Sequence, residues 1–483
     1  MKVKSMTGTD CLLTNVRLSV VPPSPVTDQI EIEIRGSVRN PGESSETFET
    51  CVYLDTVRQE SLLYREQLEV PANGVRGFSL RHRTLGWVGK HTLLMEVTAG
   101  SQTRRCQQVL EVLASDTRST RRISGAWVGL LHWSEAEGAY WNPELAQFTA
   151  ADWREHVRGM HAIGMDTIII QETWRNPTWY GIHYHQMTEA NYRTIYAGRA
   201  FYPSSLWPGR MDLPCADPLE AILDETDRLN MQVFLGLGNY AHFDYTPGSL
   251  AWHLDVLREL WSLYGHHPSL YGWYVSEELN GWIKPHEMRY WDRIDEFRAE
   301  VLTFFETLHG AIRSLAPHTL LMMAPDSHHH ADAADTWQQL LHHCDIVCVQ
   351  GYQRAPADGV PAAEVIRRMQ GWCDAAGAHH WIDLEIFGFE HPGVTEPQRE
   401  SVSRILPDGT TDFIQTPLIP QRMDLIRAEL NQLSAFEYVC AYQYPGLLAA
   451  PGCRLKPGGT RAVQFYRDYQ AYWKRLKQAG ISR

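Results

Sequence analysis

The sequence predicts two domains of different class, an all-β immunoglobulin-like sandwich over residues 1–115 and an α/β (β/α)8 TIM barrel over residues 120–483. Three observations lead to this prediction. Apolar residues recur with period two in the first hundred residues, a polar basic segment follows, and eight short apolar runs then alternate with amphipathic helical stretches. A chain of 483 residues is long enough for both domains.

The period-two pattern is clearest in QIEIEIR, where Ile30, Ile32 and Ile34 alternate with charged residues. The strand-like runs TNVRLSVV, TFETCVYLD, HTLLMEV and CQQVLEVL are separated by turn signals such as NPGE and PANG. This spacing is typical of an antiparallel sandwich of about seven strands. Cys51 and Cys106 are candidates to face each other across the two sheets, and two buried thiols are favoured over a disulfide. We assign this domain no chemistry.

The segment ASDTRSTRRIS, residues 114–124, marks the domain boundary because it is polar and basic and the apolar period changes after it. The eight runs that follow are GAWVGLLHW, DTIIIQETW, QVFLGLGN, YGWYVSEE, LLMMAP, DIVCVQGY, HWIDLEIFGF and EYVCAYQY. Helical stretches such as TAADWREHVRGMHAIG and LDVLRELWSLYG lie between them. Nearly continuous apolar strands that alternate with helices favour a closed parallel barrel, with an open doubly wound sheet as the alternative.

Composition excludes several classes of protein. Lys and Arg number 44 against 57 Asp and Glu, and the resulting net charge of −13 argues against a nucleic-acid partner. The first residues lack an apolar signal segment and no apolar run reaches about eighteen residues, so we expect no membrane partner and a cytoplasmic location. Nine cysteines without a CxxC motif indicate free thiols, and no glycine-rich phosphate loop follows any strand. We therefore expect no metal and no cofactor, while nothing here predicts the oligomeric state.

Two of the predicted strands end in glutamates. The fourth run ends with Glu277 and Glu278, and the seventh carries Asp383 and Glu385. Side chains at the carboxyl ends of barrel strands meet at one mouth of the barrel. Two carboxyl groups that face one cleft can separate into a protonated acid and an ionised nucleophile, as cleavage of a glycosidic bond requires. The alternative is that these are ordinary surface glutamates.

The fourth run, YGWYVSEELN, resembles the fourth-strand motif of clan A glycoside hydrolases, which are (β/α)8 enzymes. The spacing from Gly272 and Trp273 to Glu278 is similar to that of family 42 β-galactosidases, where a Gly-Trp pair precedes an Asn-Glu pair. The wider series of strand ends more closely resembles an uncharacterised barrel family related to that clan. The similarity spans residues 124–434, and the N-terminal region resembles the β-sandwich modules often attached to glycosidases.

The resemblance implies a retaining glycoside hydrolase that acts on a carbohydrate substrate, with Glu278 as acid/base and Glu385 as nucleophile. Two departures from the clan pattern bear on this. Glu277 stands where the clan usually has asparagine, and because successive strand residues point to opposite sides, Glu278 is favoured over Glu277 as the acid. The eighth run ends in YQY in place of the tryptophan that often floors the sugar subsite, with Tyr444 as a candidate substitute. These departures motivate an alternative, a catalytically inactive carbohydrate-binding barrel protein.

Polar and aromatic residues at the strand ends are expected to bind the substrate. The candidates are Glu277, His132, Trp133, Gln171, Trp174, Asn239, Gln350, Tyr352, Tyr442 and Tyr444, with Glu172 and Asp326 at neighbouring strand ends. The resemblance further implies that Tyr352 hydrogen-bonds Glu385. The alternative for Tyr352 is a packed tyrosine at the barrel rim.

The connection after the second run, residues 173–216, is much longer than usual, which often indicates a functional loop. Its aromatic residues are Trp174, Trp179, Tyr180, Tyr184, Tyr192, Tyr196, Tyr202 and Trp207. Aromatic faces stack on the C–H faces of sugar rings, so the loop is interpreted either as a wall of glycan subsites or as a loop with its own small core. The connection 387–417 is also long, and ILPDGTTDF within it predicts a hairpin.

Three consecutive histidines, His328, His329 and His330, follow Asp326 and raise metal-assisted hydrolysis as a third hypothesis. Consecutive residues rarely converge on one ion, so solvated loop histidines are the default. The adjacent pair His266 and His267 is expected in a helix-to-strand turn, away from the predicted site.

Overall fold

The computed structural model describes residues 15–175, 187–195, 198–238, 244–285, 288–351, 361–390, 404–405, 411–412 and 417–478. The chain divides into two compact units, one of Met1–Thr120, His309–Leu320 and Lys477–Arg483 and the other of Arg121–Leu308 and Leu321–Leu476. In the described ranges no helix is both long and apolar enough to cross a membrane. The boundary between residues 115 and 120 remains a prediction.

The N-terminal unit contains two β-sheets. Its strands are β1 (Asn15–Val21), β2 (Val26–Thr27), β3 (Glu31–Arg39), β4 (Glu46–Leu54), β5 (Leu62–Val70), β6 (Val75–Arg83), β7 (Gly89–Ala99) and β8 (Gln102–Leu113), with the 3-10 turn η1 (Gln59–Ser61). One sheet has the order β1-β3-β6 and the other β2-β8-β7-β4-β5. Ile32 and Ile34 of β3 share one apolar core with Phe48 of β4 and Met95 of β7. The all-β character is confirmed, and the immunoglobulin-like topology remains a prediction.

The expected facing of Cys51 and Cys106 across two sheets is wrong. Both residues belong to the five-stranded sheet, Cys51 on β4 and Cys106 on β8, with β7 between them. Both are free thiols. The sequence gives each strand's pattern but not which strands share a sheet.

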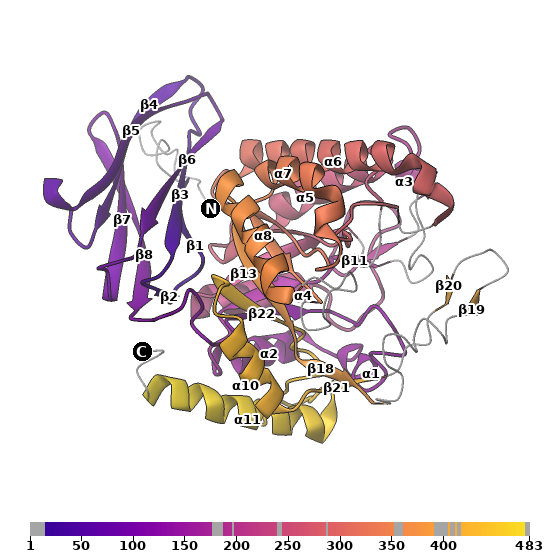
Figure 1. Ribbon diagram of the computed structural model, residues 1–483. Coiled ribbons are helices and arrows are strands. Elements are labelled where there is room, and N and C mark those ends of the chain that lie inside the picture. The colour runs from indigo at the N-terminus through magenta and orange to yellow at the C-terminus, as the bar shows by residue number, and fades with distance from the viewer. Residues whose placement is uncertain are drawn as a thin grey trace, which may run out of the picture. The chain divides into compact units, whose positions relative to one another are not determined.

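The second unit is a closed parallel barrel (Figure 1). Its strands are β9 (Gly125–Val128), β10 (Thr167–Ile170), β13 (Gln232–Leu237), β14 (Leu270–Val275), β15 (Leu320–Met323), β16 (Ile346–Val349), β17 (His379–Glu385) and β22 (Tyr438–Tyr442). They follow one another around the barrel in chain order, and β22 closes it against β9. Each of the eight apolar runs contributes one strand, so the closed barrel is confirmed over the open sheet.

Helices connect the strands. They are α1 (Asn142–Leu145), α2 (Ala150–His161), α3 (Tyr192–Ile195), α4 (Pro218–Leu229), α5 (Pro247–Tyr264), α6 (Ile294–Leu315), α7 (Ala334–Leu340), α8 (Ala362–Ala376), α10 (Met423–Gln432) and α11 (Gly459–Gln478), with η2 (Met288–Arg293), η3 (His330–Ala333) and η4 (Leu341–His343). Local sequence sets their starts. Asp217 caps α4 by accepting from the Glu220 amide, and Pro218 opens that helix.

Short strand pairs occur within the long connections. β11 (Trp174–Arg175) pairs with β12 (Arg199–Ala200), β18 (Phe387–Phe389) with β21 (Leu418–Pro420), and β19 (Arg404–Ile405) with β20 (Thr411–Asp412), each antiparallel. The β19–β20 pair confirms the hairpin predicted from ILPDGTTDF, whose turn lies outside the described residues.

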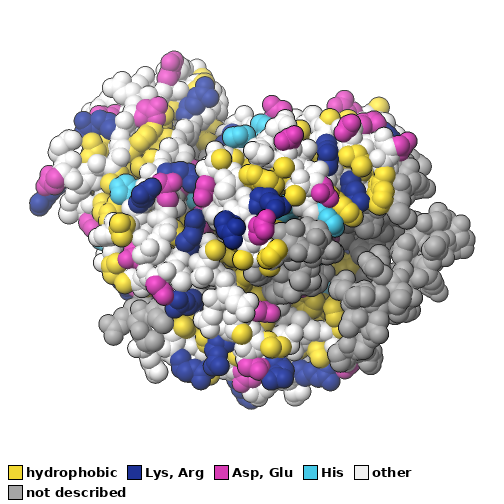
Figure 2. All heavy atoms as spheres, in the orientation of Figure 1, with side chains coloured by type: hydrophobic (Ala, Val, Ile, Leu, Met, Phe, Trp, Pro, Cys, Tyr) yellow, Lys and Arg dark blue, Asp and Glu magenta, His cyan; other side chains and the backbone are white. Residues whose placement is uncertain are grey.

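Aromatic side chains fill the barrel. Trp127 of β9 meets Tyr274 of β14 edge to face at 5.9 Å, and Trp381 of β17 meets Phe234 of β13 at 6.0 Å. These strands are not neighbours, so the rings meet across the barrel axis. The chain has 17 tryptophans, and some of them therefore serve internal packing. On the face drawn in Figure 2, basic and acidic side chains are interspersed.

Candidate active site

Six predicted site residues lie where the barrel strands end. Glu385 and Tyr442 are the last residues of β17 and β22, Gln171 follows β10 directly, and Gln350 follows β16 directly. Glu278 stands three residues after β14, and His132 four residues after β9. Because all eight strands are parallel, these positions share one mouth of the barrel.

Glu278 is held by Gln350. The Gln350 side-chain amide donates to Oε1 of Glu278 at 2.7 Å, and both side chains are partly buried. The Gln350 backbone is itself fixed, since its amide donates to the Pro325 carbonyl at 2.9 Å and it forms a β-bridge with Asp326. A carboxyl oxygen of Glu278 is thus oriented by an anchored donor.

Glu277 turns to the other side of its segment. It is 5% exposed, and its Oε1 lies 3.7 Å from Nε2 of His253 on α5. Burial lowers the pKa of His253 to about 4, and its Nδ1 contacts the Ser249 carbonyl at 2.8 Å. The Tyr245 hydroxyl donates to the Glu277 carbonyl at 3.3 Å. Glu277 therefore packs against a helix, while Glu278 reaches the strand-end residue of β16.

Glu385 lies beside Tyr442. The two residues are paired in register between β17 and β22, and Glu385 is partly buried. Asp383, two residues earlier on β17, is 2% exposed. Residues two apart on a strand share a face, so Asp383 and Glu385 lie on the same side of β17.

Tyr442 joins three strand ends. Its hydroxyl accepts from Nε2 of Gln171 at 3.0 Å and lies 3.3 Å from Nε2 of His132. Burial lowers the pKa of His132 to about 3, so the ring is neutral, whereas burial raises the pKa of Tyr442 far above its ordinary value. On the other side of the ring, Nδ1 of His132 lies 3.1 Å from the Ser134 carbonyl and 3.2 Å from the Ser134 backbone amide, so Ser134 and Tyr442 hold the ring at both nitrogens. Trp133, partly buried, also hydrogen-bonds Tyr442.

Glu172 forms a buried ion pair in place of a free strand-end carboxylate. Nε of Arg175 donates to Oε1 of Glu172 at 2.6 Å, and the same guanidinium donates to the His132 and Leu131 carbonyls at 2.8 and 2.6 Å. The Arg175 guanidinium therefore fixes the backbone that carries His132.

A family model described as "Domain of unknown function (DUF4434)" matches residues 123–453. The chain belongs to the DUF4434 family. The match contains all eight barrel strands together with Glu278 and Glu385. No curated protein matches the sequence.

Solved glycosidases share low similarity with this DUF4434 protein. β-Glucuronidase 2 of Bacteroides uniformis, covalently bound to cyclophellitol-6-carboxylate aziridine, is 14% identical, with coverage of 95% of this chain and 50% of that one and a TM-score of 0.43. A GH2 β-galacturonidase from Eisenbergiella tayi bound to galacturonate is 12% identical (96% and 72%, TM-score 0.41). A putative β-galactosidase from Bacteroides fragilis is 12% identical (97% and 62%, TM-score 0.37). The chain thus spans about half the length of the first of these.

Two of the predicted substrate-binding aromatics lie in the interior of the DUF4434 domain. Trp174 is fully buried, donates its indole N–H to Tyr202 at 3.1 Å and meets Trp252 edge to face. Tyr444 is fully buried against His156 of α2, with ring centroids 4.5 Å apart. Neither presents a face to a substrate in this structure, because each ring is enclosed by neighbouring elements. Asn239 and Tyr352 lie outside the described residues.

The loop after β10 packs mostly on itself and on α5. Tyr192 donates to Asp255 and Tyr202 to Glu259, each at 2.7 Å. Trp207 differs, since it is 68% exposed and lines a cavity of about 310 Å³ together with Trp252. Trp179, Tyr180, Tyr184 and Tyr196 lie outside the described residues. The described part of the loop therefore favours the self-packed alternative, with Trp207 as the exposed aromatic face.

The three consecutive histidines diverge. A ring nitrogen of His330 lies 2.7 Å from the Asp326 carbonyl, and His329 stacks on Trp282 at 4.5 Å. Oδ1 of Asp326 accepts from the backbone amides of His328 and Gly281. Burial acts to raise the pKa of Asp326, but hydrogen bonds outweigh it and lower the pKa. In the described structure the three rings do not gather as a metal-binding group.

Sequence reasoning missed Gln443. This residue is fully buried, and a Cβ built on Gly129 would lie 3.0 Å from the side-chain oxygens of both Gln443 and Gln171. Two amide side chains therefore meet over a backbone position that has room only for glycine. Gln443 is the middle residue of the YQY run, but the interpretation of that run was based on its two tyrosines.

Proposed function

We propose that this protein is a retaining glycoside hydrolase in which Glu278 is the acid/base and Glu385 the nucleophile. One observation carries the proposal. Two partly buried glutamates stand at the same mouth of one closed barrel, and Gln350 orients one of them at 2.7 Å. The turning of Glu277 toward His253 supports Glu278 as the acid.

In the proposed reaction the Glu385 carboxylate attacks the anomeric carbon. The bond from that carbon to the leaving oxygen breaks, and this oxygen takes the proton of Glu278. Glu278, now ionised, then removes a proton from water, whose oxygen displaces Glu385 from the sugar. The products are a sugar of retained configuration and a free alcohol.

Substrate contacts are proposed around these two groups. His132, Trp133, Gln171 and Tyr442 form a connected group at the ends of β9, β10 and β22. His132 and Gln171 are fully buried, so their proposed role is to position Tyr442 and Trp133. The partly buried ring of Trp133 is the proposed stacking surface for a sugar. Asn239 and Tyr352 remain proposed contacts from the sequence.

The test is a screen of the purified full chain against aryl glycosides and defined oligosaccharides, followed by isosteric variants. We expect Glu385→Gln and Glu278→Gln each to reduce kcat by at least about 10³-fold with the fold intact. Glu306→Gln, an exposed position on α6, is the matched control and should retain full activity. Proton NMR of the first product should show retained anomeric configuration. Near wild-type turnover in either site variant, or an inverted product, contradicts the proposal.

The alternative is a carbohydrate-binding barrel without catalysis. The position of Glu277 favours it, because the asparagine that clan A enzymes usually place there is replaced by a side chain packed on α5. Calorimetry that detects glycan binding by wild-type protein with no released sugar on prolonged incubation would establish this alternative.

A further inference from the structure

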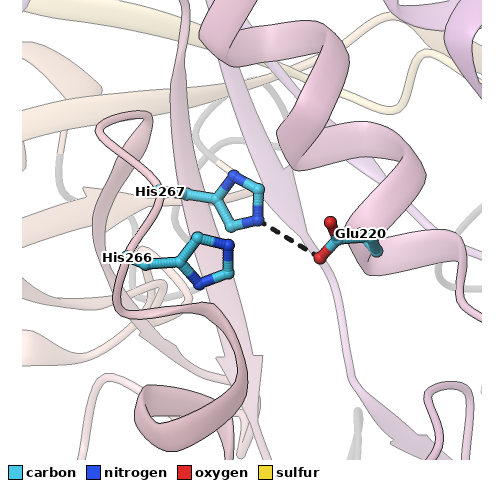
Figure 3. A group of neighbouring side chains, drawn as sticks. All are labelled: Glu220, His266 and His267. Atoms are coloured by element: carbon cyan, nitrogen blue, oxygen red, sulfur yellow. Dashed lines mark hydrogen bonds and ion pairs between the residues drawn. The ribbon is translucent and has the colours of Figure 1, made fainter. Parts of the chain in front are cut away.

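A second group of polar side chains lies between α4 and the turn that precedes β14. Among the described residues, Glu220, His266 and His267 each offer one ligand atom, and these atoms lie within 4.8 Å of one another. Figure 3 shows both imidazole rings and the carboxylate directed toward a common space. None of the three takes part in the proposed glycosidase site.

His267 is fixed between two carboxylates of one helix face. Its Nδ1 lies 2.7 Å from Oδ2 of Asp227, and its Nε2 lies 3.2 Å from Oε2 of Glu220. Glu220 and Asp227 are seven residues apart on α4, which is close to two helical turns, so both project from the same side. The side chain of His267 is only 5% exposed.

Asp227 is suited to orient His267 for metal binding. A histidine ligand usually donates its second ring N–H to a carboxylate, which leaves the other nitrogen as the donor to the metal. Asp227 is itself anchored, because its Oδ1 accepts from the Ser269 amide at 2.9 Å. With Nδ1–H directed at Asp227, Nε2 of His267 faces Glu220.

His266 completes the set. Its ring lies beside His267, with centroids 4.1 Å apart, and both His266 and Glu220 are exposed. Tetrahedral zinc with ligand bonds of about 2.0–2.1 Å places its ligand atoms about 3.3 Å apart. The separation from Nε2 of His267 to Oε2 of Glu220 is 3.2 Å, close to this value, and the ligand atom of His266 lies within 4.8 Å of both.

We propose that Glu220, His266 and His267 form a binding site for Zn²⁺, with water at the fourth position and Asp227 as the positioning residue. Two imidazoles and one carboxylate are a donor set that zinc favours. Such an ion would join α4 to the turn between α5 and β14.

The test uses tag-free full chain, freed of metal with chelator and titrated with ZnCl2 by calorimetry. We expect one site per chain and a rise in Tm with zinc. His266→Asn and Glu220→Gln should each weaken binding by at least about tenfold, and Asp227→Asn by about 10- to 100-fold. Because His267 is buried, the exposed residues are the primary variants. Co²⁺ should give the visible absorption of a four-coordinate site.

His342→Asn is the control, because it alters another adjacent histidine pair, in η4, and should leave zinc binding unchanged. The His328→Asn/His329→Asn variant tests a further pair of adjacent histidines, which are partly buried, in the same way. Unchanged affinity in the His266→Asn/Glu220→Gln double variant overturns the proposal. So does the lack of saturable binding below about 100 μM zinc. These results do not depend on whether the barrel cleaves a sugar.

Discussion

The side-chain amide of Gln350 donates a hydrogen bond of 2.7 Å to Oε1 of Glu278. Their strands, β16 and β14, are separated in the barrel by β15. The bond therefore spans a neighbouring strand, at the end where the proposed chemistry takes place. Gln350 is accordingly a positioning residue for Glu278 in the proposed mechanism.

Replacement of Gln350 by Met should reduce kcat about 10- to 100-fold with little change in KM, because a hydrogen bond to a charged group contributes about 1.5–3 kcal/mol. Met has a similar length but no N–H donor. Gln350→Glu should have a larger effect at neutral pH, because it brings a second carboxyl group beside Glu278. We expect its activity to recover in part at lower pH, where the two groups share a proton.

The measurement is a pH profile of kcat and kcat/KM for both variants on one aryl glycoside. If Gln350 has a purely structural role, both variants should be less stable than wild type, and the pH profiles of the two variants should be alike. That result would remove the positioning role.

The buried Arg175–Glu172 pair should make a large contribution to stability. Arg175→Met leaves the Glu172 carboxylate, 2% exposed, without its cationic partner and removes two donors to backbone carbonyls. We expect a loss of about 3–5 kcal/mol in the free energy of unfolding, measured by urea denaturation. The double variant Arg175→Met/Glu172→Leu should recover part of this loss, because no buried charge then remains. If the double variant loses as much free energy of unfolding as the two single variants lose together, the argument is contradicted.

The barrel could be predicted because each apolar run had the length of one strand and was followed by helical periodicity. The orientation of Glu277 and Glu278 could be predicted too, since neighbouring residues of an extended segment point to opposite sides. Glu278 contacts Gln350 and Glu277 contacts His253, in agreement with that rule.

The accessibility of aromatic residues could not be predicted. Tyr192 and Tyr202 are enclosed because Asp255 and Glu259 of α5 accept their hydroxyls, and these partners lie 63 and 57 residues further along the chain. Tyr444 is buried because the chain after β22 turns beneath α2, where His156 contacts its ring. Local sequence carries no signal for such long-range partners.

The pH dependence of stability should include a contribution from His156. This ring lies among Phe148, Trp153 and Tyr444, and burial lowers its pKa to about 3. Between the unfolded value of about 6.5 and pH 3, only the unfolded chain binds this proton, so the free energy of unfolding falls as pH falls. His156→Phe removes the contribution. Between about pH 5.5 and 4.5, wild type should lose about 1.4 kcal/mol more than the variant.

Urea denaturation at a series of pH values checks this expectation. His342→Phe is the matched control. His342 is exposed, so its imidazole ring is solvated in both the folded and the unfolded chain. Parallel stability curves for wild type and His156→Phe would show that His156 takes up a proton in the folded protein.

Gly238, at the end of β13, should tolerate no side chain. Its φ is +87°, and an added Cβ would lie 2.4 Å from Nε2 of His253 and 3.1 Å from Oε1 of Glu277. We expect Gly238→Ala to lower the free energy of unfolding by at least about 1–2 kcal/mol from backbone conformation alone, with a further loss as His253 is displaced.

Gly371→Ala is the matched control for this substitution. Gly371 lies in α8 with no atom within 4 Å of an added Cβ, so the same change should stabilise the protein by up to about 1 kcal/mol. Adding His253→Ala to Gly238→Ala removes the clashing ring and leaves only the backbone cost. The two substitutions should therefore be less damaging together than the sum of their separate effects, which a double-mutant cycle measures directly. Strict additivity would mean that Gly238 is required only for its backbone conformation, not for the approach of α5 to Glu277.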